Sequence, residues 1–318
     1  MIKKRFFPLA IGLALAFGGT SAYAAEFYFD IGTNYSAAGT KADGPTTTGV
    51  FEEMQFVYDS TTYFTDTNGD GFYSPGDSSR GTGGILNEPA FDIGDATPQR
   101  NRITGFTPGF TGDPSDAAPN GFGTDWFLTF GWNDLVAEVN SFGGLTYTSG
   151  TIQMFYYETA SGGFANRVNF MNLEVIGGGI NEIGQSLNLE TKVSFEGLDG
   201  STQVTDGGTT IADFILLANG TSFYDYIQSG EEMILAFVDQ NTQPFYTNGV
   251  EGASPVGVAY DENGELVLAG RHDGSIVFEV PEPSALLLLG SGLLGLGLAL
   301  GLRRRSTKTL PEGGLSPA

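Results

Sequence analysis

Apolar and polar side chains alternate with a period of two along the middle of the chain. Met54, Phe56 and Tyr58 form one such series. The same spacing recurs in two further series: Trp126, Leu128, Phe130 and Trp132, then Ile152, Met154 and Tyr156. Because successive side chains of a strand point to opposite faces, this pattern predicts strands with one buried face.

A hairpin is predicted near the end of this region. Val256–Tyr260 and Leu266–Ala269 flank Asp261–Gly264, in which Asn-Gly supplies the positive φ that a tight turn needs. We expect Arg271–Gly274 to form a further turn before a strand over Ser275–Phe278. Together these segments predict an antiparallel meander.

Two other stretches are less regular. Residues 210–218 have apolar spacing that suits a short helix or a strand, and residues 81–123 are rich in Gly, Pro, Asp and Asn, which predicts long loops. The 48 glycines follow no fixed period, as expected for an all-β protein with many turns. We therefore expect residues 25–279 to form one antiparallel β-sandwich or jelly-roll-like domain, with two smaller sandwiches as the alternative.

The N-terminal 24 residues have the features of an export signal. Lys3, Lys4 and Arg5 precede an apolar stretch, which ends in the small-residue pattern Ala22-x-Ala24. We expect signal peptidase to remove residues 1–24 and the mature chain to begin at Ala25.

The C-terminal region has the pattern of a membrane anchor. Residues 285–302 are uncharged, and 18 helical residues span about 27 Å, close to the bilayer core of about 30 Å. Arg303, Arg304 and Arg305 follow at once and should remain cytoplasmic. We expect one transmembrane helix in the inner membrane, the body outside, and residues 306–318 as a short cytoplasmic tail.

Pro281, Glu282 and Pro283, the apolar span and the arginine cluster, within residues 280–305, resemble the PEP-CTERM sorting signal. The resemblance implies a substrate of exosortase in a Gram-negative bacterium that produces exopolysaccharide. It also implies that the tripeptide is recognised and the span removed, so that the body is secreted or held at the cell surface or in the extracellular matrix. The tail after Arg305 is longer than is usual in that family.

Composition excludes several kinds of chemistry. The chain has no cysteine and one histidine, which rules out disulfides, thiolate zinc sites, cysteine nucleophiles and multi-histidine metal centres. Residues 25–278 carry 7 basic and 34 acidic residues, a formal charge of −27. Such a body lacks the basic patch that nucleic acid requires, and it attracts divalent cations.

One segment has the spacing of a calcium loop. Residues 66–77 match the twelve-residue template in which alternate short side chains supply hard oxygen ligands and a glycine at position six allows a sharp turn. The expected ligands are the side chains of Asp66, Asn68, Asp70, Ser74 and Asp77 and the carbonyl oxygen of Phe72.

This loop resembles those of EF-hands, dockerins and thrombospondin-type calcium repeats. The last ligand is Asp77 rather than glutamate, and the flanking residues are not helical, so the segment is not a helix–loop–helix hand. The alternative is a polar hairpin loop whose Asp and Asn side chains only stabilise turns.

Catalytic patterns are sparse. The single histidine, His272, falls in the expected turn, where we expect it to face solvent rather than serve as an oriented base. A glycosidase needs two carboxylates at a suitable separation, and Glu52-Glu53 and Glu231-Glu232 are candidates by adjacency alone. Neighbours on a strand point to opposite faces, so such pairs rarely share a site.

Segments including Gly44–Gly49 and Gly274–Phe278 also resemble the flocculation-associated branch of PEP-CTERM proteins. This resemblance implies a matrix or cell-aggregation protein rather than an enzyme. Together with the predicted calcium loop and the sorting signal, we expect a non-catalytic exported protein that binds calcium and bridges cells or acidic exopolysaccharide. The alternative is a secreted carbohydrate-binding or glycoside-hydrolysing module. Trp126 and Trp132 have the same parity and so share a face, although core packing is the default for both.

Overall fold

A computed structural model describes residues 25–35, 44–70, 74–87, 100–107, 120–180, 187–245, 259–260 and 266–279. The expected signal peptide with Ala22 and Ala24, the sorting signal with its arginines, the span at 285–302 and the tail at 306–318 lie outside these residues. Within the part that the structure describes, no helix is long and apolar enough to cross a membrane.

The described chain is dominated by strands, which confirms the all-β fold. The longer strands are β2 (Glu53–Thr65), β3 (Ser78–Gly84), β4 (Arg102–Thr107), β5 (Trp126–Val139), β6 (Leu145–Ser149), β7 (Thr151–Glu158), β8 (Val168–Ile180), β9 (Asn188–Ser194), β11 (Ile234–Phe245) and β13 (Leu266–Glu279). The short elements are β1 (Phe27–Phe29), β10 (Ile215–Leu217), β12 (Ala259–Tyr260), the 3-10 helix η1 (Gly163–Asn166), α1 (Ile211–Phe214) and α2 (Phe223–Gln228).

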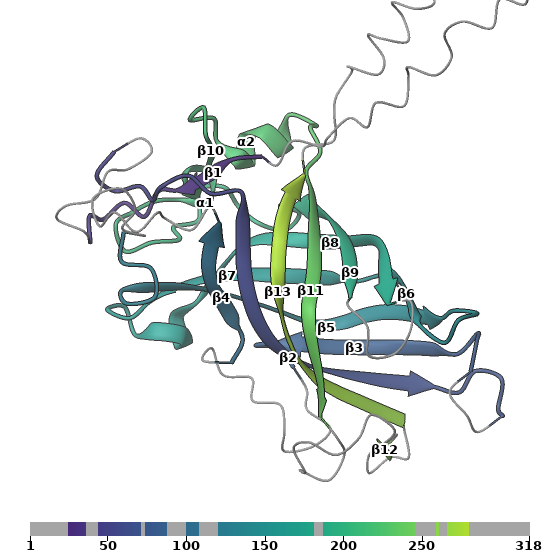
Figure 1. The fold of residues 1–318 in the computed structure, drawn as a ribbon. Coiled ribbons are helices and arrows are strands. Elements are labelled where there is room, and N and C mark those ends of the chain that lie inside the picture. The colour runs from purple at the N-terminus through teal and green to yellow at the C-terminus, as the bar shows by residue number, and fades with distance from the viewer. Residues whose placement is uncertain are drawn as a thin grey trace, which may run out of the picture. The chain divides into compact units, whose positions relative to one another are not determined.

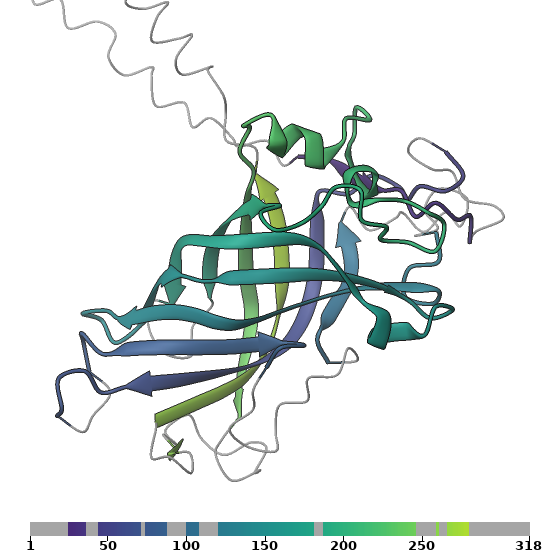
Figure 2. The same cartoon turned by 180° about the vertical axis from the view of Figure 1, so that it is seen from behind.

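The strands pair antiparallel in a continuous series that returns to its starting point. From β2 the series runs through β13, β11, β9, β8, β7, β5 and β3, and β3 pairs with β2 again. β4 adds to β2, β6 lies between β5 and β8, and β12 adds to β13. In Figure 1, β11 and β13 run upright across the direction of β8, β7, β5 and β3, and Figure 2 shows the same two layers from behind. The arrangement is sandwich-like, as expected.

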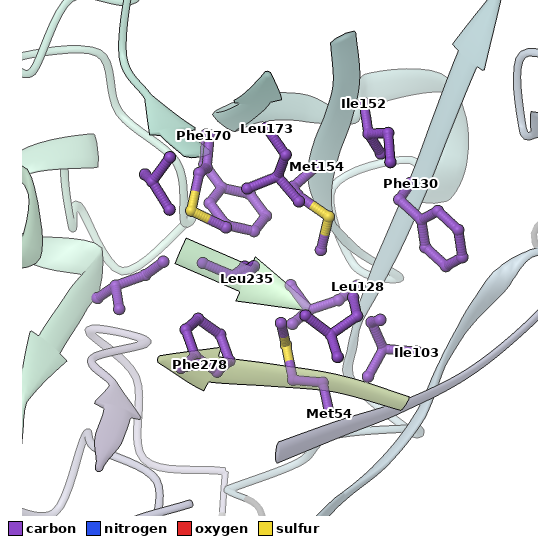
Figure 3. Packing of buried hydrophobic residues seen from close by; sticks show 14 of the residues in the cluster. Met54, Ile103, Leu128, Phe130, Ile152, Met154, Phe170, Leu173, Leu235 and Phe278 are labelled. Carbon is purple, nitrogen blue, oxygen red and sulfur yellow. The ribbon is translucent and has the colours of Figure 1, made fainter. Parts of the chain in front are cut away.

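The alternating positions found in the sequence line the space between these layers. Met54, Phe56 and Tyr58 of β2 are buried, whereas Gln55 between them is exposed. Figure 3 shows Met54, Leu128, Met154 and Phe278 among the buried side chains that meet there. Each fully buried apolar side chain of this size stabilises the fold by about 1.5–3 kcal/mol through loss of contact with water.

One end of the body, the cap end, is closed by β1 and β10 together with α1 and α2. Phe27 and Phe29 of β1 point into the core, where Phe27 lies 4.2 Å from Phe278 and Phe29 stacks on Phe51 at 5.0 Å between ring centroids. The segment 210–218, for which the sequence allowed a short helix or a strand, forms both: α1 is followed directly by β10.

The prediction of long loops across residues 81–123 was wrong in two places. Gly81–Gly84 complete β3, and Arg102–Thr107 form β4. The glycines are required by close packing, since a Cβ at Gly83 would lie 2.2 Å from the Trp132 ring. Gly84 has φ +63 and approaches the carbonyl of Phe130, which leaves no room for a side chain. These glycines are therefore strand residues whose backbone packs closely against Trp132 and Phe130, and they do not form a loop.

The predicted turn at Arg271–Gly274 was also wrong. β13 is continuous from Leu266 to Glu279 and pairs with β11 on one edge and with β2 on the other. Hydrogen bonding on both edges holds this glycine-containing stretch extended, so local turn propensity is overridden. The pairing of β12 with the start of β13 confirms the hairpin before it, although its turn lies outside the described residues.

Candidate functional site

The expected calcium loop connects β2 to β3, so its flanks are strands and not helices, which agrees with the prediction that the segment is not a helix–loop–helix hand. Asp66–Asp70 and Ser74–Asp77 are described, whereas Phe72 lies outside the described residues. β2 runs from the cap end to this loop, which therefore occupies the opposite end of the body, seen at the right-hand side of Figure 1.

The first half of the loop is organised by side chains that accept backbone hydrogen bonds. Asp66 Oδ1 accepts from the N–H of Gly69 at 2.6 Å and of Asp70 at 3.2 Å. Asn68 Oδ1 accepts from the N–H of Asp70 at 2.9 Å. Asp and Asn side chains that bond backbone a few residues ahead stabilise tight turns. These bonds therefore stabilise the turn conformation of the loop.

Asp77 fastens the second half of the loop to the first. Its Oδ1 accepts from the N–H of Thr67 at 3.0 Å, and its Oδ2 accepts from the N–H of Ser74 at 2.8 Å and from the Ser74 hydroxyl at 3.3 Å. The backbone hydrogen bond from Ser74, followed by that from Thr67, holds the pKa of Asp77 below its ordinary value, against the opposing effect of burial. Asp77 is thus ionised at neutral pH and closes the loop.

Four of the six expected ligands are joined by hydrogen bonds in the described part of this loop. The side-chain oxygens of Asp66, Asn68, Ser74 and Asp77 are linked by hydrogen bonds within it, and the Asn68 amide donates to Ser74 Oγ at 2.7 Å. In the described ranges no group of three or more histidine or acidic side chains is arranged to hold a metal ion. The calcium site stays a prediction.

The loop is anchored to a neighbouring hairpin. The N–H of Gly76 donates to the carbonyl of Val139 at 3.0 Å, and the N–H of Val139 donates to the carbonyl of Asp77 at 2.8 Å. Val139 ends β5, and the turn that follows carries Phe142, whose side chain is 81% exposed. We refer to loop 66–77 and turn 140–144 together as the hairpin end.

The prediction that His272 faces solvent in a turn was wrong. It lies in β13, only 9% exposed, stacked on Tyr58 at 4.4 Å between ring centroids, with Nε2 2.8 Å from Ser60 Oγ. Asp59 precedes Ser60 in β2 and therefore points to the opposite face of the sheet. The Ser60–His272 contact thus does not have Asp59 as the third member of a triad.

Asp59 is held from that opposite face. Its Oδ1 accepts from Arg271 Nε at 2.9 Å, Arg100 Nη1 lies 3.6 Å from Oδ2, and its own N–H donates to Asn101 Oδ1 at 2.8 Å. A buried carboxylate with two guanidinium neighbours is a compensated charge that ties β2 to β13. We therefore assign the Asp59 carboxylate a structural role.

Glu158 is the buried carboxylate of the cap end. Its Oε2 accepts from the Tyr35 hydroxyl at 2.9 Å, and its Oε1 accepts from the Tyr156 hydroxyl at 2.5 Å and from the N–H of Asp206 at 3.0 Å. Burial, followed by the bond to Glu158, raises the pKa of Tyr35 to about 12 and raises that of Tyr156 as well. The network joins three segments that are distant in the sequence.

The sequence analysis did not single out Glu158, although a signal was present. The inward series Ile152, Met154, Tyr156 continues by parity to Glu158, which places a carboxylate on the buried face of the strand. The adjacent pairs considered for glycoside hydrolysis are placed differently. Glu231 and Glu232 are exposed, and Glu232 pairs with Lys192 at 2.7 Å.

Trp126 and Trp132 do share a face, but it is the inner one. Trp126 is fully buried and Trp132 is 5% exposed, and the Trp126 indole donates to the carbonyl of Asn120 at 2.7 Å. Both rings belong to the core, so neither provides an exposed platform for a sugar.

Comparison with known protein families matches residues 279–305 to the PEP-CTERM protein-sorting motif. The match begins at Glu279, the last residue of β13. It confirms the resemblance found in the sequence and indicates an exported protein that exosortase processes. No curated protein and no solved structure matches the chain.

Proposed function

We propose that this chain is a non-catalytic protein of the extracellular matrix or cell surface of a Gram-negative bacterium, associated with exopolysaccharide in biofilm or flocculation. One observation carries the proposal: the sorting motif begins where β13, a central strand of the body, ends. Processing at the motif therefore delivers the whole strand-built body, with its formal charge of −27 in residues 25–278, to the exterior.

Calcium has two roles in this proposal. It binds loop 66–77 and stabilises the hairpin end, and it screens repulsion between the acidic body and anionic polymers, so that aggregation depends on divalent ions. The turns at Asp66 and Asn68 and the ionised Asp77 support the first role, because they keep hard oxygen atoms within one short loop. A bound ion would exchange some of these N–H contacts for its own.

The calcium site is tested by calorimetry of the exported protein. Calcium should raise the melting temperature, and Asp70→Ala should remove the increase. Asp199→Ala is the matched control, because Asp199 also accepts a backbone N–H, from Ser201 at 2.9 Å, in an exposed turn outside the loop. The control variant should keep the full increase. An unchanged melting temperature in the parent protein would leave only a polar turn.

The matrix role is tested in the producing cell. Deleting the gene should reduce aggregation in the presence of calcium, and re-expression should restore it. The competing function, a glycoside hydrolase, predicts release of reducing sugar from polysaccharides and its loss on substitution of one carboxylate. The burial and pairing of Asp59 and Glu158 favour the non-catalytic role. Turnover of a glycan by the purified protein would overturn it.

A further inference from the structure

Loop 66–77 contains an Asn-Gly pair, Asn68-Gly69, with contacts that favour a chemical change of the chain itself. In such a pair the side-chain amide carbon and the next backbone nitrogen can join into a five-membered succinimide ring. Glycine favours this ring because it has no Cβ to obstruct the approach. Asn68 and Gly69 are both exposed, and Gly69 has φ +75. The pair is therefore sterically open and accessible to water.

The backbone nitrogen that would close the ring is bonded to a carboxylate. The N–H of Gly69 donates to Asp66 Oδ1 at 2.6 Å. This nitrogen must lose its proton as it attacks the Asn68 side chain, and a carboxylate at hydrogen-bond distance is placed to accept that proton as a general base. Asp66 thus contacts the reacting nucleophile directly.

The amide group of Asn68 is held on the other side of the reaction. Its Oδ1 accepts from the N–H of Asp70 at 2.9 Å, and its Nδ2 donates to Ser74 Oγ at 2.7 Å. A side-chain oxygen that bonds the N–H two residues ahead folds the side chain over the intervening peptide, here that of Gly69. The same N–H stabilises the negative charge that develops on Oδ1 during ring closure, as an oxyanion donor does.

We propose that Asn68-Gly69 is a self-modification site, at which the loop converts Asn68 to aspartate and isoaspartate through a succinimide. The nitrogen of Gly69 bonds to Cγ of Asn68 while its proton passes to Asp66. The Cγ–Nδ2 bond then breaks, and Nδ2 takes up that proton and leaves as ammonia. Water opens the ring at either carbonyl, so water is the only co-reactant. The products add negative charge to the loop, and isoaspartate also lengthens its backbone.

A second Asn-Gly pair, Asn219-Gly220, is a matched internal control. It is also exposed, and Asn219 Oδ1 accepts from the N–H of Thr221 at 2.9 Å, so it has the same folded-forward amide. The N–H of Gly220, however, donates to the carbonyl oxygen of Leu217 at 2.7 Å. A peptide carbonyl is not a base at neutral pH, so this pair has the oxyanion donor without the proton acceptor.

The exported protein is incubated at neutral pH with EDTA, so that no ion occupies the loop oxygens, and peptide mapping by mass spectrometry follows each asparagine. We expect Asn68 to convert at least about tenfold faster than Asn219, below the roughly 10²–10⁴-fold of an enclosed base, because Asp66 is exposed. Asn120, before Gly121, is buried and donates to two carbonyls, so it should stay unconverted.

Unfolding in urea removes these contacts, so Asn68 and Asn219 should then convert at similar rates. Equal rates in the folded protein would overturn the proposal, because the base would have no effect. The same ratio in urea as in the folded protein would also overturn it, because the difference would then come from sequence alone. Labelling by an isoaspartyl methyltransferase shows whether conversion passes through the ring, and absence of isoaspartate at position 68 would exclude the succinimide.

Asp66→Asn removes the base and should slow conversion of Asn68 at least about tenfold, while Asn219 keeps its rate. Asp70→Asn is the matched control, because it removes an equal charge from the same loop and keeps the N–H from which Asn68 Oδ1 accepts. It should change the rate by less than about twofold. Melting temperatures report whether each variant folds. Conversion at the parent rate in Asp66→Asn, or equal slowing in Asp70→Asn, would refute the role of Asp66 and the proposal with it.

This chemistry needs only the loop and water, so it is independent of the matrix role and of calcium binding. If calcium raises the melting temperature but Asn68 and Asn219 convert alike, only the self-modification is wrong. If Asn68 converts selectively but calcium has no effect, the modification stands and the calcium site is wrong.

Discussion

The two ends of the body are each fastened by a buried carboxylate, but in contrasting surroundings. Glu158 at the cap end accepts from two tyrosine hydroxyls and one N–H beside packed aromatic rings. Asp77 at the hairpin end accepts from two backbone N–H groups and a serine hydroxyl within a polar loop.

The comparison shows that a carboxylate accepting several hydrogen bonds can stabilise either tertiary structure or a local loop. Around Glu158 the donors are distant in sequence and surrounded by core, so the carboxylate fixes tertiary structure. Around Asp77 the donors are local and near solvent, so the carboxylate shapes a loop whose oxygens remain near the surface. We expect the cap end to dominate stability and the hairpin end to respond to ions.

The largest expected effect is at the cap end. Phe29→Ala removes a fully buried ring that contacts Phe51 and Trp126, and it should lower the free energy of unfolding by about 3–5 kcal/mol. Urea denaturation measures the change. Phe142→Ala, at the exposed turn of the hairpin end, should stay within about 0.5 kcal/mol. Comparable losses in both variants would remove the contrast between the ends.

Glu158→Gln should have the next largest effect. An amide offers one acceptor oxygen and places an NH₂ donor against hydroxyl and N–H donors, so unfolding free energy should fall by about 1–3 kcal/mol. Glu232→Gln, which breaks only the exposed pair with Lys192, should cost about 0–1 kcal/mol. Equal effects in the two variants would mean that Glu158 does not organise the cap end.

Tyr35→Phe should lower the free energy of unfolding by less than Glu158→Gln does, and the size of this loss should depend on pH in the alkaline range. Loss of the hydroxyl that donates to Glu158 should cost about 0.5–1.5 kcal/mol at neutral pH. The pKa of Tyr35 is raised to about 12 from about 10 in the unfolded chain. Its contribution is therefore complete below pH about 10 and is lost as pH rises through about 12.

Denaturation of the parent and Tyr35→Phe proteins across this range should show their difference shrinking above pH about 10. In the Glu158→Gln background the same substitution should cost markedly less, because the acceptor carboxylate is gone. A difference that persists unchanged into alkali would contradict this assignment.

The smallest effect is expected at the hairpin end, with the opposite pH dependence. The pKa of Asp77 is lowered in the folded state, so its contribution is present above the unfolded value of about 4 and is lost as pH falls through the lower folded value. The melting temperature of Asp77→Asn should lie below that of the parent at neutral pH and converge with it in acid. Divergence on acidification would show that the sign is wrong.

Much of the strand core could be predicted, because Met54–Tyr58, Trp126–Trp132 and Ile152–Tyr156 carry their own alternation. The end of β3 could not, because Gly83 and Gly84 are selected by the approach of Trp132 and Phe130, which sequence order does not reveal. The partners of Glu158 likewise lie 123 residues away at Tyr35 and 48 residues away at Asp206. The turn-forming role of the Asp and Asn side chains in Asp66–Asp77 could be predicted, because the N–H groups that they bind lie within the same short loop.

Beside the ring contact of Phe27 with Phe278 at the cap end, a backbone hydrogen bond joins the first described residue to the last strand. The N–H of Ala25 donates to the carbonyl of Phe278 at 3.0 Å, one residue before the sorting motif starts. The first described residue and the end of the last strand are thus hydrogen-bonded neighbours, so the residue at which the sorting motif starts lies on the same side of the body as Ala25.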